Sequence, residues 1–149
     1  MIHETAQVSP LAHVDGSATL GANVVVEPFA FVGPDVHVGE GSWVGPHATL
    51  LGNTKVGREC KLFPGCVVGA DSQDLKYKGE PTSVEIGDRT SIRECVTVHR
   101  ATTDKMITRV GSDCAWPRHA AGCRCRRSGD AGHGTAPAVP DQVRRQGAG

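Results

Sequence analysis

The sequence predicts an all-β solenoid in which short strands wind into stacked, parallel coils. Three observations lead to this prediction. An aliphatic residue stands at every sixth position over the first half of the chain, and glycine often follows it directly. Aromatic residues make up only 4% of the 149 residues, too few for a conventional globular core. A Gly-rich, aromatic-poor composition is typical of a repetitive β architecture or of disorder, and the regular spacing favours the first.

The six-residue period begins at the second residue and is unbroken over twelve positions. The aliphatic residues of this series are Ile2, Val8, Val14, Leu20, Val26, Val32, Val38, Val44, Leu50, Val56, Leu62 and Val68, and the phase returns at Ile86, Ile92, Val98 and Val110. A period of six fits neither an α-helix nor a simple alternating strand. It fits a short strand followed by a sharp corner. Three such units close one triangular coil, which gives about five coils stacked at the usual strand spacing.

The residues next to this series indicate how each corner is built. Small side chains recur four positions after the aliphatic residue, at Ala6, Ala12, Ala18, Ala30, Ala48, Cys60 and Cys66. We expect the aliphatic residue to fill the core and the small residue to occupy a crowded corner. Glycine directly follows the aliphatic residue at Gly21, Gly33, Gly39, Gly45, Gly57, Gly69, Gly87 and Gly111. We expect these glycines to relieve backbone strain where the chain turns.

The repeat fails between Val68 and Ile86, where Asp74 and Glu80 stand at the aliphatic positions. Neither charge suits a narrow, dry core, so we expect a protruding loop at about residues 71–83. Insertions in solenoids often lie on the binding face. A loop with Gln73, Asp74, Lys76 and Tyr77 suits a ligand that carries a sugar and phosphate. The alternative is an ordinary solvated excursion of the chain.

Composition excludes several classes of function. Lys and Arg together number 16, as do Asp and Glu, so the formal net charge is zero. The charge therefore gives no indication that the chain binds nucleic acid. No apolar stretch approaches the ~20 residues of a membrane span. The first residues, MIHETAQVSP, lack the basic and apolar regions of a signal peptide. Six Cys residues without an export signal are expected to be reduced thiols in the cytoplasm.

The amino-acid sequence of the loop and of the segment after it identifies a family more specifically than the hexapeptide repeat does. QDLKYKGEPT, followed by VEIGDRTSIRECVTVHRAT and VGSD, resembles the acyl-[acyl-carrier-protein]–UDP-N-acetylglucosamine O-acyltransferases of lipid A synthesis. The resemblance covers residues 1 to about 113. It implies a left-handed β-helix of hexapeptide repeats, without a cofactor or metal. It also implies transfer of a 3-hydroxyacyl chain from acyl carrier protein to the 3-hydroxyl of UDP-N-acetylglucosamine, by a homotrimer with active sites between its subunits.

The resemblance assigns binding roles to four side chains. Gln73, Asp74 and Lys76 are expected in the loop that reaches the nucleotide sugar and the acyl donor, and His99 on a coil that faces the cleft. The alternative for His99 is a purely structural role. A second enzyme class, the later UDP-3-O-acylglucosamine N-acyltransferases, also has hexapeptide repeats but lacks this loop wording.

The resemblance ends after Asp113. The family continues with a segment in which two His stand three residues apart, and one of them is its general base. No His-x-x-His occurs in this chain, and His119 and His133 have no family context, so no catalytic residue is assigned. We therefore expect no useful acyltransferase activity from this chain. The alternative to an enzyme is a non-catalytic hexapeptide-repeat fragment.

The composition changes at the same point. Of the 36 residues in 114–149, 22 are Ala, Gly, Arg or Pro. Such a segment cannot bury enough apolar area to order itself, and we expect a disordered tail. Cys123, Cys125 and His119 supply only three of the four ligands of a structural zinc site, so a zinc site is disfavoured. Binding of nucleic acid or anionic lipid by the arginines in 124–127 is disfavoured too.

Ala, Gly, Arg and Pro, which dominate residues 114–149, have GC-rich codons. Our hypothesis is therefore a frameshift just after the codon for Asp113. Sequencing the locus across this codon tests the hypothesis. The expected finding is an alternative frame that encodes a strand with His-x-x-His, and a locus without such a frame would contradict it.

Overall fold

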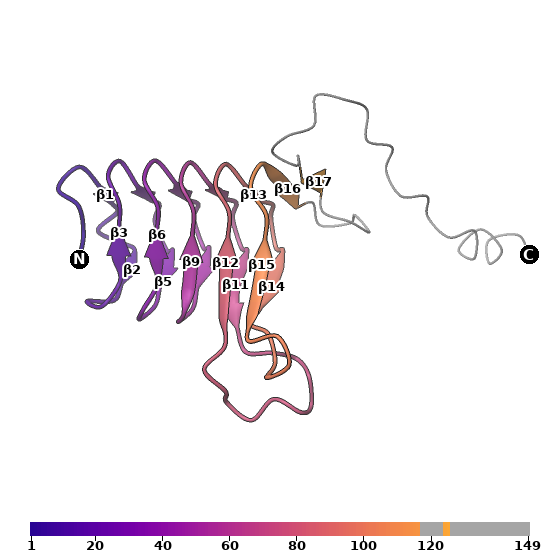
Figure 1. The fold of residues 1–149 in the computed structure, drawn as a ribbon. Coiled ribbons are helices and arrows are strands. Elements are labelled where there is room, and N and C mark those ends of the chain that lie inside the picture. Colours follow the sequence, from indigo (N-terminus) through magenta and orange to yellow (C-terminus); the bar gives the residue numbers. More distant parts are fainter. Residues whose placement is uncertain (117–123, 126–149) are drawn as a thin grey trace, which may run out of the picture.

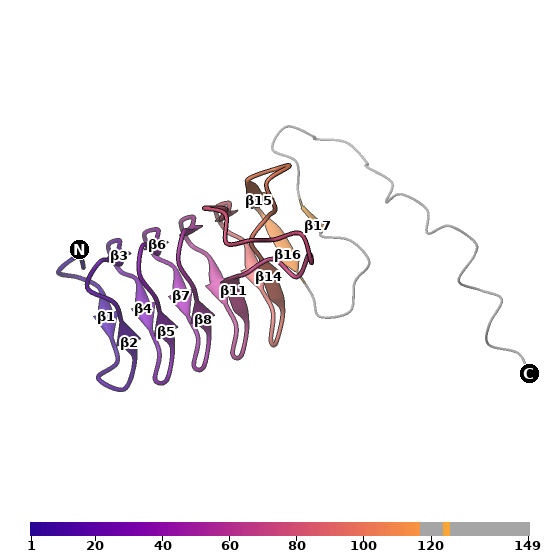
Figure 2. The same ribbon diagram turned by 90° about the horizontal axis from the view of Figure 1, so that it is seen from below.

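The computed structural model describes residues 1–116 and 124–125, and every element in these ranges is a β-strand. The strands form three sheets, which Figures 1 and 2 show from two directions. The first sheet contains, in spatial order, β1 (Gln7–Val8), β4 (Val25–Val26), β7 (Trp43–Val44), β10 (Lys61–Leu62), β13 (Ser91–Ile92), β16 (Cys114–Trp116) and β17 (Arg124–Cys125). The second contains β14 (Thr97–His99), β11 (Val67–Ala70), β8 (Thr49–Leu50), β5 (Phe31–Val32) and β2 (His13–Val14). The third contains β15 (Ile107–Val110), β12 (Ser83–Ile86), β9 (Thr54–Val56), β6 (His37–Val38) and β3 (Thr19–Leu20).

The register between strands confirms the coil predicted from the period of six. Val8 pairs with Val26, and Val32 pairs with Leu50, so partners lie 18 positions apart, which is three six-residue units. All pairs from β1 to β16 are parallel, and only β17 runs antiparallel to its neighbour. The chain therefore forms the expected left-handed parallel β-helix of about five coils.

The core consists of the two buried positions of each unit. From Leu20 onward the aliphatic residues of the series are at most 4% exposed. The residues four positions later are at most 6% exposed, except Ser72 and Thr102, where the chain leaves the coils. Burial raises the pKa of the Cys66 thiol to about 12, so this side chain stays neutral and serves as a small core residue. The prediction is wrong for the first coil, where Ile2 is 50% exposed and Val8 and Val14 are only partly buried, because one side of this coil has no neighbour in the structure.

The role predicted for the glycines is also wrong, although their position matters. Of the glycines that follow the aliphatic residue, only Gly69 has a positive φ. The left-handed corner residue instead lies three positions after the aliphatic residue, as at Asn23 (φ 55°) and Asp35 (φ 54°). The glycines are needed because neighbouring coils approach closely. A Cβ on Gly39 would lie 2.5 Å from the carbonyl oxygen of Gly57, a distance that no side chain tolerates.

A second insertion was not predicted. Val56 pairs with Ile86, 30 positions apart, so the first loop adds 12 residues to the 18 of a coil. Ile86 pairs with Val110, 24 positions apart, so 6 residues are added between β14 and β15. The signal in the sequence was Asp104, a charged residue at the aliphatic position between Val98 and Val110.

The last described coil continues beyond the expected end of the β-helix at Asp113. Cys114–Trp116 forms β16 and pairs with β13. The expected disordered tail otherwise concerns residues 117–123 and 126–149, which lie outside the described residues. Cys60, Cys66 and Cys95 are free thiols, as expected. The expectation of a reduced thiol is wrong for Cys114, which is disulfide-bonded. Among the described residues there is neither a helix able to span a membrane nor a cluster of three metal-ligating side chains.

The close approach of the coils makes a testable prediction at Gly39. The alanine Cβ in Gly39→Ala meets backbone atoms of the next coil, which cannot move without breaking the stack. We expect the free energy of unfolding to fall by about 1–3 kcal/mol, the usual cost of overpacking. The measurement is equilibrium unfolding in urea.

Gly16→Ala is the matched control, because a Cβ at Gly16 has no atom within 4 Å. We expect this variant to unfold at the same urea concentration as the wild type or slightly above it. Equal stability of the two variants would contradict the account of the glycines.

Candidate functional site

Two loops leave the β-helix at the same corner, between the second and third sheets (Figure 1). We call the connection between β11 and β12, residues 71–82, the long loop, and the connection between β14 and β15, residues 100–106, the short loop. The backbone N–H of Arg100 donates to the carbonyl of Ala70 at 2.8 Å, and that of Ser83 donates to the carbonyl of Met106 at 3.0 Å. These bonds join the bases of the two loops. The loop predicted at residues 71–83 is therefore present, with Ser83 already in β12.

The long loop is tied internally around Asp74. The Asp74 carboxylate accepts a hydrogen bond from the N–H of Lys76 at 2.9 Å, and its carbonyl accepts one from the N–H of Tyr77 at 2.9 Å. Further along, the Tyr77 hydroxyl donates to the carbonyl of Glu80 at 3.2 Å, and the Lys78 N–H donates to the Glu80 carboxylate at 2.9 Å. Asp74 thus shapes a turn, a role that its residue type favours and that the sequence analysis did not consider.

The side chains of Gln73, Asp74 and Lys76 project from this turn and are exposed. Leu75 between them is fully exposed, at 101%. The structure thus brings three of the four predicted site residues together on one segment. His99 lies at the base of the loop instead, and no hydrogen bond or ion pair within residues 1–116 and 124–125 joins it to the other three.

His99 is held in one orientation by the first residue of the long loop. Its Nδ1 lies 2.7 Å from the carbonyl oxygen of Asp71. A carbonyl oxygen only accepts, so Nδ1 carries the hydrogen, and in the neutral ring Nε2 presents a lone pair. This Nε2 is buried and has no hydrogen-bond partner among the described residues. Nε2 is therefore an oriented acceptor that the surrounding residues enclose.

Two residues beside His99 were missed by the sequence analysis. Arg100 forms an ion pair with the carboxylate of Asp71, and its guanidinium lies 6.0 Å from the centre of the Tyr77 ring. Their positions in the sequence could have identified them, because each is the first residue of a loop. Asp71 follows the last strand before the long loop, and Arg100 follows the last strand before the short loop.

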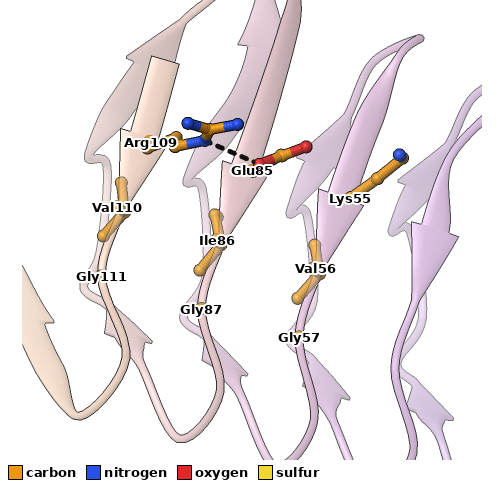
Figure 3. A pocket seen from close by; sticks show the side chains of 9 residues that line it. All are labelled: Lys55, Val56, Gly57, Glu85, Ile86, Gly87, Arg109, Val110 and Gly111. Carbon is orange, nitrogen blue, oxygen red and sulfur yellow. Dashed lines mark hydrogen bonds and ion pairs between the residues drawn. The ribbon is translucent and has the colours of Figure 1, made fainter. Parts of the chain in front are cut away.

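A shallow hollow of about 360 Å³ lies elsewhere, on the outer face of the third sheet (Figure 3). Lys55, Glu85 and Arg109 stand in register along its rim, and Arg109 Nε donates to the Glu85 carboxylate at 2.9 Å. Arg109 is 70% exposed, so this pair contributes little to stability. The hollow contains no residue of either loop, and we do not include it in the site.

Comparison with known proteins agrees with this architecture. A family model described as bacterial transferase hexapeptide (six repeats) matches residues 35–70. A UDP-N-acetylglucosamine acyltransferase from Bacteroides fragilis is 40% identical over 72% of this chain and 42% of its own length, with a TM-score of 0.72. The UDP-N-acetylglucosamine O-acyltransferase of Moraxella catarrhalis is 36% identical over 74% of this chain and 41% of its own, with a TM-score of 0.58.

A perosamine N-acetyltransferase from Caulobacter crescentus shares the fold, with 20% identity and a TM-score of 0.53 over 76% of this chain and 50% of its own length. The chain thus spans about two fifths of the length of the two UDP-N-acetylglucosamine acyltransferases. The hexapeptide repeat, the parallel coils and these similarities agree with one another. The chain belongs to the hexapeptide-repeat acyltransferases, and its β-helix corresponds to the N-terminal part of the UDP-N-acetylglucosamine acyltransferases.

Proposed function

We propose that this chain is the nucleotide-sugar-binding part of an O-acyltransferase that acts on UDP-N-acetylglucosamine. One observation carries the proposal: the long loop presents exposed Gln73, Asp74 and Lys76, and at its base His99 is oriented with an Nε2 that has no hydrogen-bond partner among the described residues. The chain is 40% identical to a protein named for this acceptor.

Each of the four side chains has a chemical role in this proposal. The free carboxylate oxygen of Asp74 accepts hydrogen bonds from sugar hydroxyls, and the Gln73 amide both donates and accepts. Lys76 supplies a compact cation for the diphosphate. His99 Nε2 accepts a hydrogen bond from a ligand hydroxyl in the neutral ring, and a protonated His99 donates to a phosphate oxygen instead.

The proposed reaction is acyl transfer from 3-hydroxyacyl-[acyl carrier protein]. The oxygen of the sugar 3-hydroxyl attacks the thioester carbonyl while a general base takes the hydroxyl proton. The C–S bond then breaks, and the carrier thiolate takes that proton from the base. The proposal includes a homotrimer in the cytoplasm, with the site between neighbouring β-helices. The residues that the family resemblance links to the base lie in a His-x-x-His segment that these 149 residues do not contain. For this chain by itself we therefore propose binding without turnover.

The binding role of Asp74 is tested by Asp74→Ala. The variant removes an acceptor for a sugar hydroxyl, which is worth roughly 0.5–1.5 kcal/mol, or about a 2- to 12-fold higher Kd for UDP-N-acetylglucosamine. Isothermal titration calorimetry of the 149-residue chain measures this difference.

Asp74→Asn separates ligand binding from the turn, because an Asn side-chain oxygen still accepts the hydrogen bond from the Lys76 N–H. If the charge of Asp74 serves the ligand, Asp74→Asn also raises the Kd, whereas Glu40→Ala, an exposed change in an earlier coil, does not. An unchanged Kd in Asp74→Ala would remove Asp74 from the site.

The absence of turnover is tested directly by an acyl-transfer assay. The purified chain is incubated with UDP-N-acetylglucosamine and 3-hydroxyacyl-[acyl carrier protein], with a full-length relative as the positive control. We expect no measurable product, because a positioned base alone typically contributes about 10²- to 10⁴-fold, and loss of orientation costs more.

Turnover within about tenfold of the full-length relative would overturn this expectation, since loss of the base lowers the rate at least about 10²-fold.

The N-acyltransferase alternative is tested by calorimetry with another ligand. UDP-N-acetylglucosamine is replaced by its 3-O-acylated, deacetylated derivative. Tighter binding of that derivative would favour the alternative.

A further inference from the structure

The start of the long loop is held at three points by two consecutive residues of the neighbouring coil, one at Ala70 and two at Asp71. The N–H of Arg100 donates to the carbonyl of Ala70, directly before the loop. The Nδ1 of His99 donates to the carbonyl of Asp71. The guanidinium of Arg100 pairs with the carboxylate of Asp71. Backbone and side chain of the loop's first residue are thus both fixed from the end of β14.

Arg100 differs from the other paired arginines in its burial. Its side chain is 18% exposed, whereas those of Arg89 and Arg109 are 54% and 70% exposed. Its Nε is buried without an acceptor among the described residues. The Asp71 carboxylate, itself 68% exposed, pairs with this mostly enclosed guanidinium, so the ion pair lies at the edge of the site with one partner in water. Removal of Asp71 leaves an enclosed guanidinium without this partner, which we expect to cost more than the loss of the well-exposed pair of Arg109.

The same guanidinium links the start of the long loop to its middle. It lies 6.0 Å from the centre of the Tyr77 ring, within the range of a cation–π contact. Tyr77 in turn holds the carbonyl of Glu80 through its hydroxyl. The contacts of one arginine thus extend over residues 71–80, the segment in which Gln73, Asp74 and Lys76 lie.

We propose that Arg100 is a positioning residue that, through Asp71 and Tyr77, sets the orientation of the long loop for the nucleotide sugar. This inference rests on the proposed function. Arg100 acts through the loop and does not touch the ligand. A planar, forked guanidinium suits this role because it pairs with a carboxylate and faces a ring at the same time, which the compact ammonium of lysine does not do.

The test uses the 149-residue chain and two measurements. Hydrogen exchange reports how firmly the amides of Lys76, Tyr77 and Lys78 are held, and calorimetry reports the Kd for UDP-N-acetylglucosamine. In Arg100→Gln we expect these amides to exchange at least about fivefold faster and the Kd to rise by a similar factor, as for loss of one coupled contact. Arg100→Lys is expected to restore neither value fully.

A double-mutant cycle separates positioning from a general loss of structure. Asp71→Asn alone should reproduce the effect of Arg100→Gln, and the double variant should be no worse than either, because both changes break the same contact. Arg109→Gln, which breaks the exposed pair with Glu85 on the third sheet, is the matched control and should change neither measurement.

Unchanged exchange of the loop amides in Arg100→Gln, or additive effects of the two changes on exchange, would overturn the inference. A wild-type chain that does not bind UDP-N-acetylglucosamine would overturn the proposed function instead. The exchange comparison would then still decide whether Arg100 holds the loop.

Discussion

The structure depends on the in-register stacking of its coils. Each strand bonds to the strand one coil earlier, so every residue lies against its counterpart in the neighbouring coil. Val26 lies against Val8 and Val44, and Gly39 approaches Gly57 more closely than a Cβ allows. In-register stacking restricts the residue type at every position of the six-residue unit, which is why the repeat is unbroken from Ile2 to Val68.

The same requirement explains where the functional side chains lie. Residues in excess of 18 per coil cannot stay within the stack, because they would shift every later pair out of register. The long loop adds 12 residues and the short loop 6, both whole units of six, so the pairing resumes in phase after each one. Both insertions leave at the same corner, which places the two loops side by side (Figure 1). His99 lies at this corner too, because its Nδ1 bonds to the carbonyl of Asp71.

The parts of the structure that repeat were predictable from the sequence, and the parts that depend on single contacts were not. Twelve equivalent positions identified the core, and two charges at the next positions, Asp74 and Glu80, identified the long loop. The actual corner position escaped prediction because several residue types occupy it, including Phe29 and Glu59 with positive φ. Composition alone does not reveal such strained positions.

The candidate site shows the same division. Gln73, Asp74 and Lys76 were identified from the wording of the loop and its family resemblance, and the structure places them on one turn. The pair between Asp71 and Arg100 joins residues 29 positions apart through the stacking of two coils. No local pattern in the sequence indicates that pair, because it exists only once the register is known.

The central claim is that the stacked coils make the fold and the long loop makes the binding site. Deletion of residues 71–82 tests this claim most directly, since it removes the 12 surplus residues and brings Ile86 six positions after Val68, which continues the repeat from Ile2 to Val98. The measurement is calorimetric titration of the deleted chain with UDP-N-acetylglucosamine, after circular dichroism and urea unfolding have shown whether the coils persist. The account predicts an intact, cooperatively unfolding β-structure that no longer binds the nucleotide sugar. Binding with the affinity of the intact chain, or collapse of the coils on deletion, would contradict it.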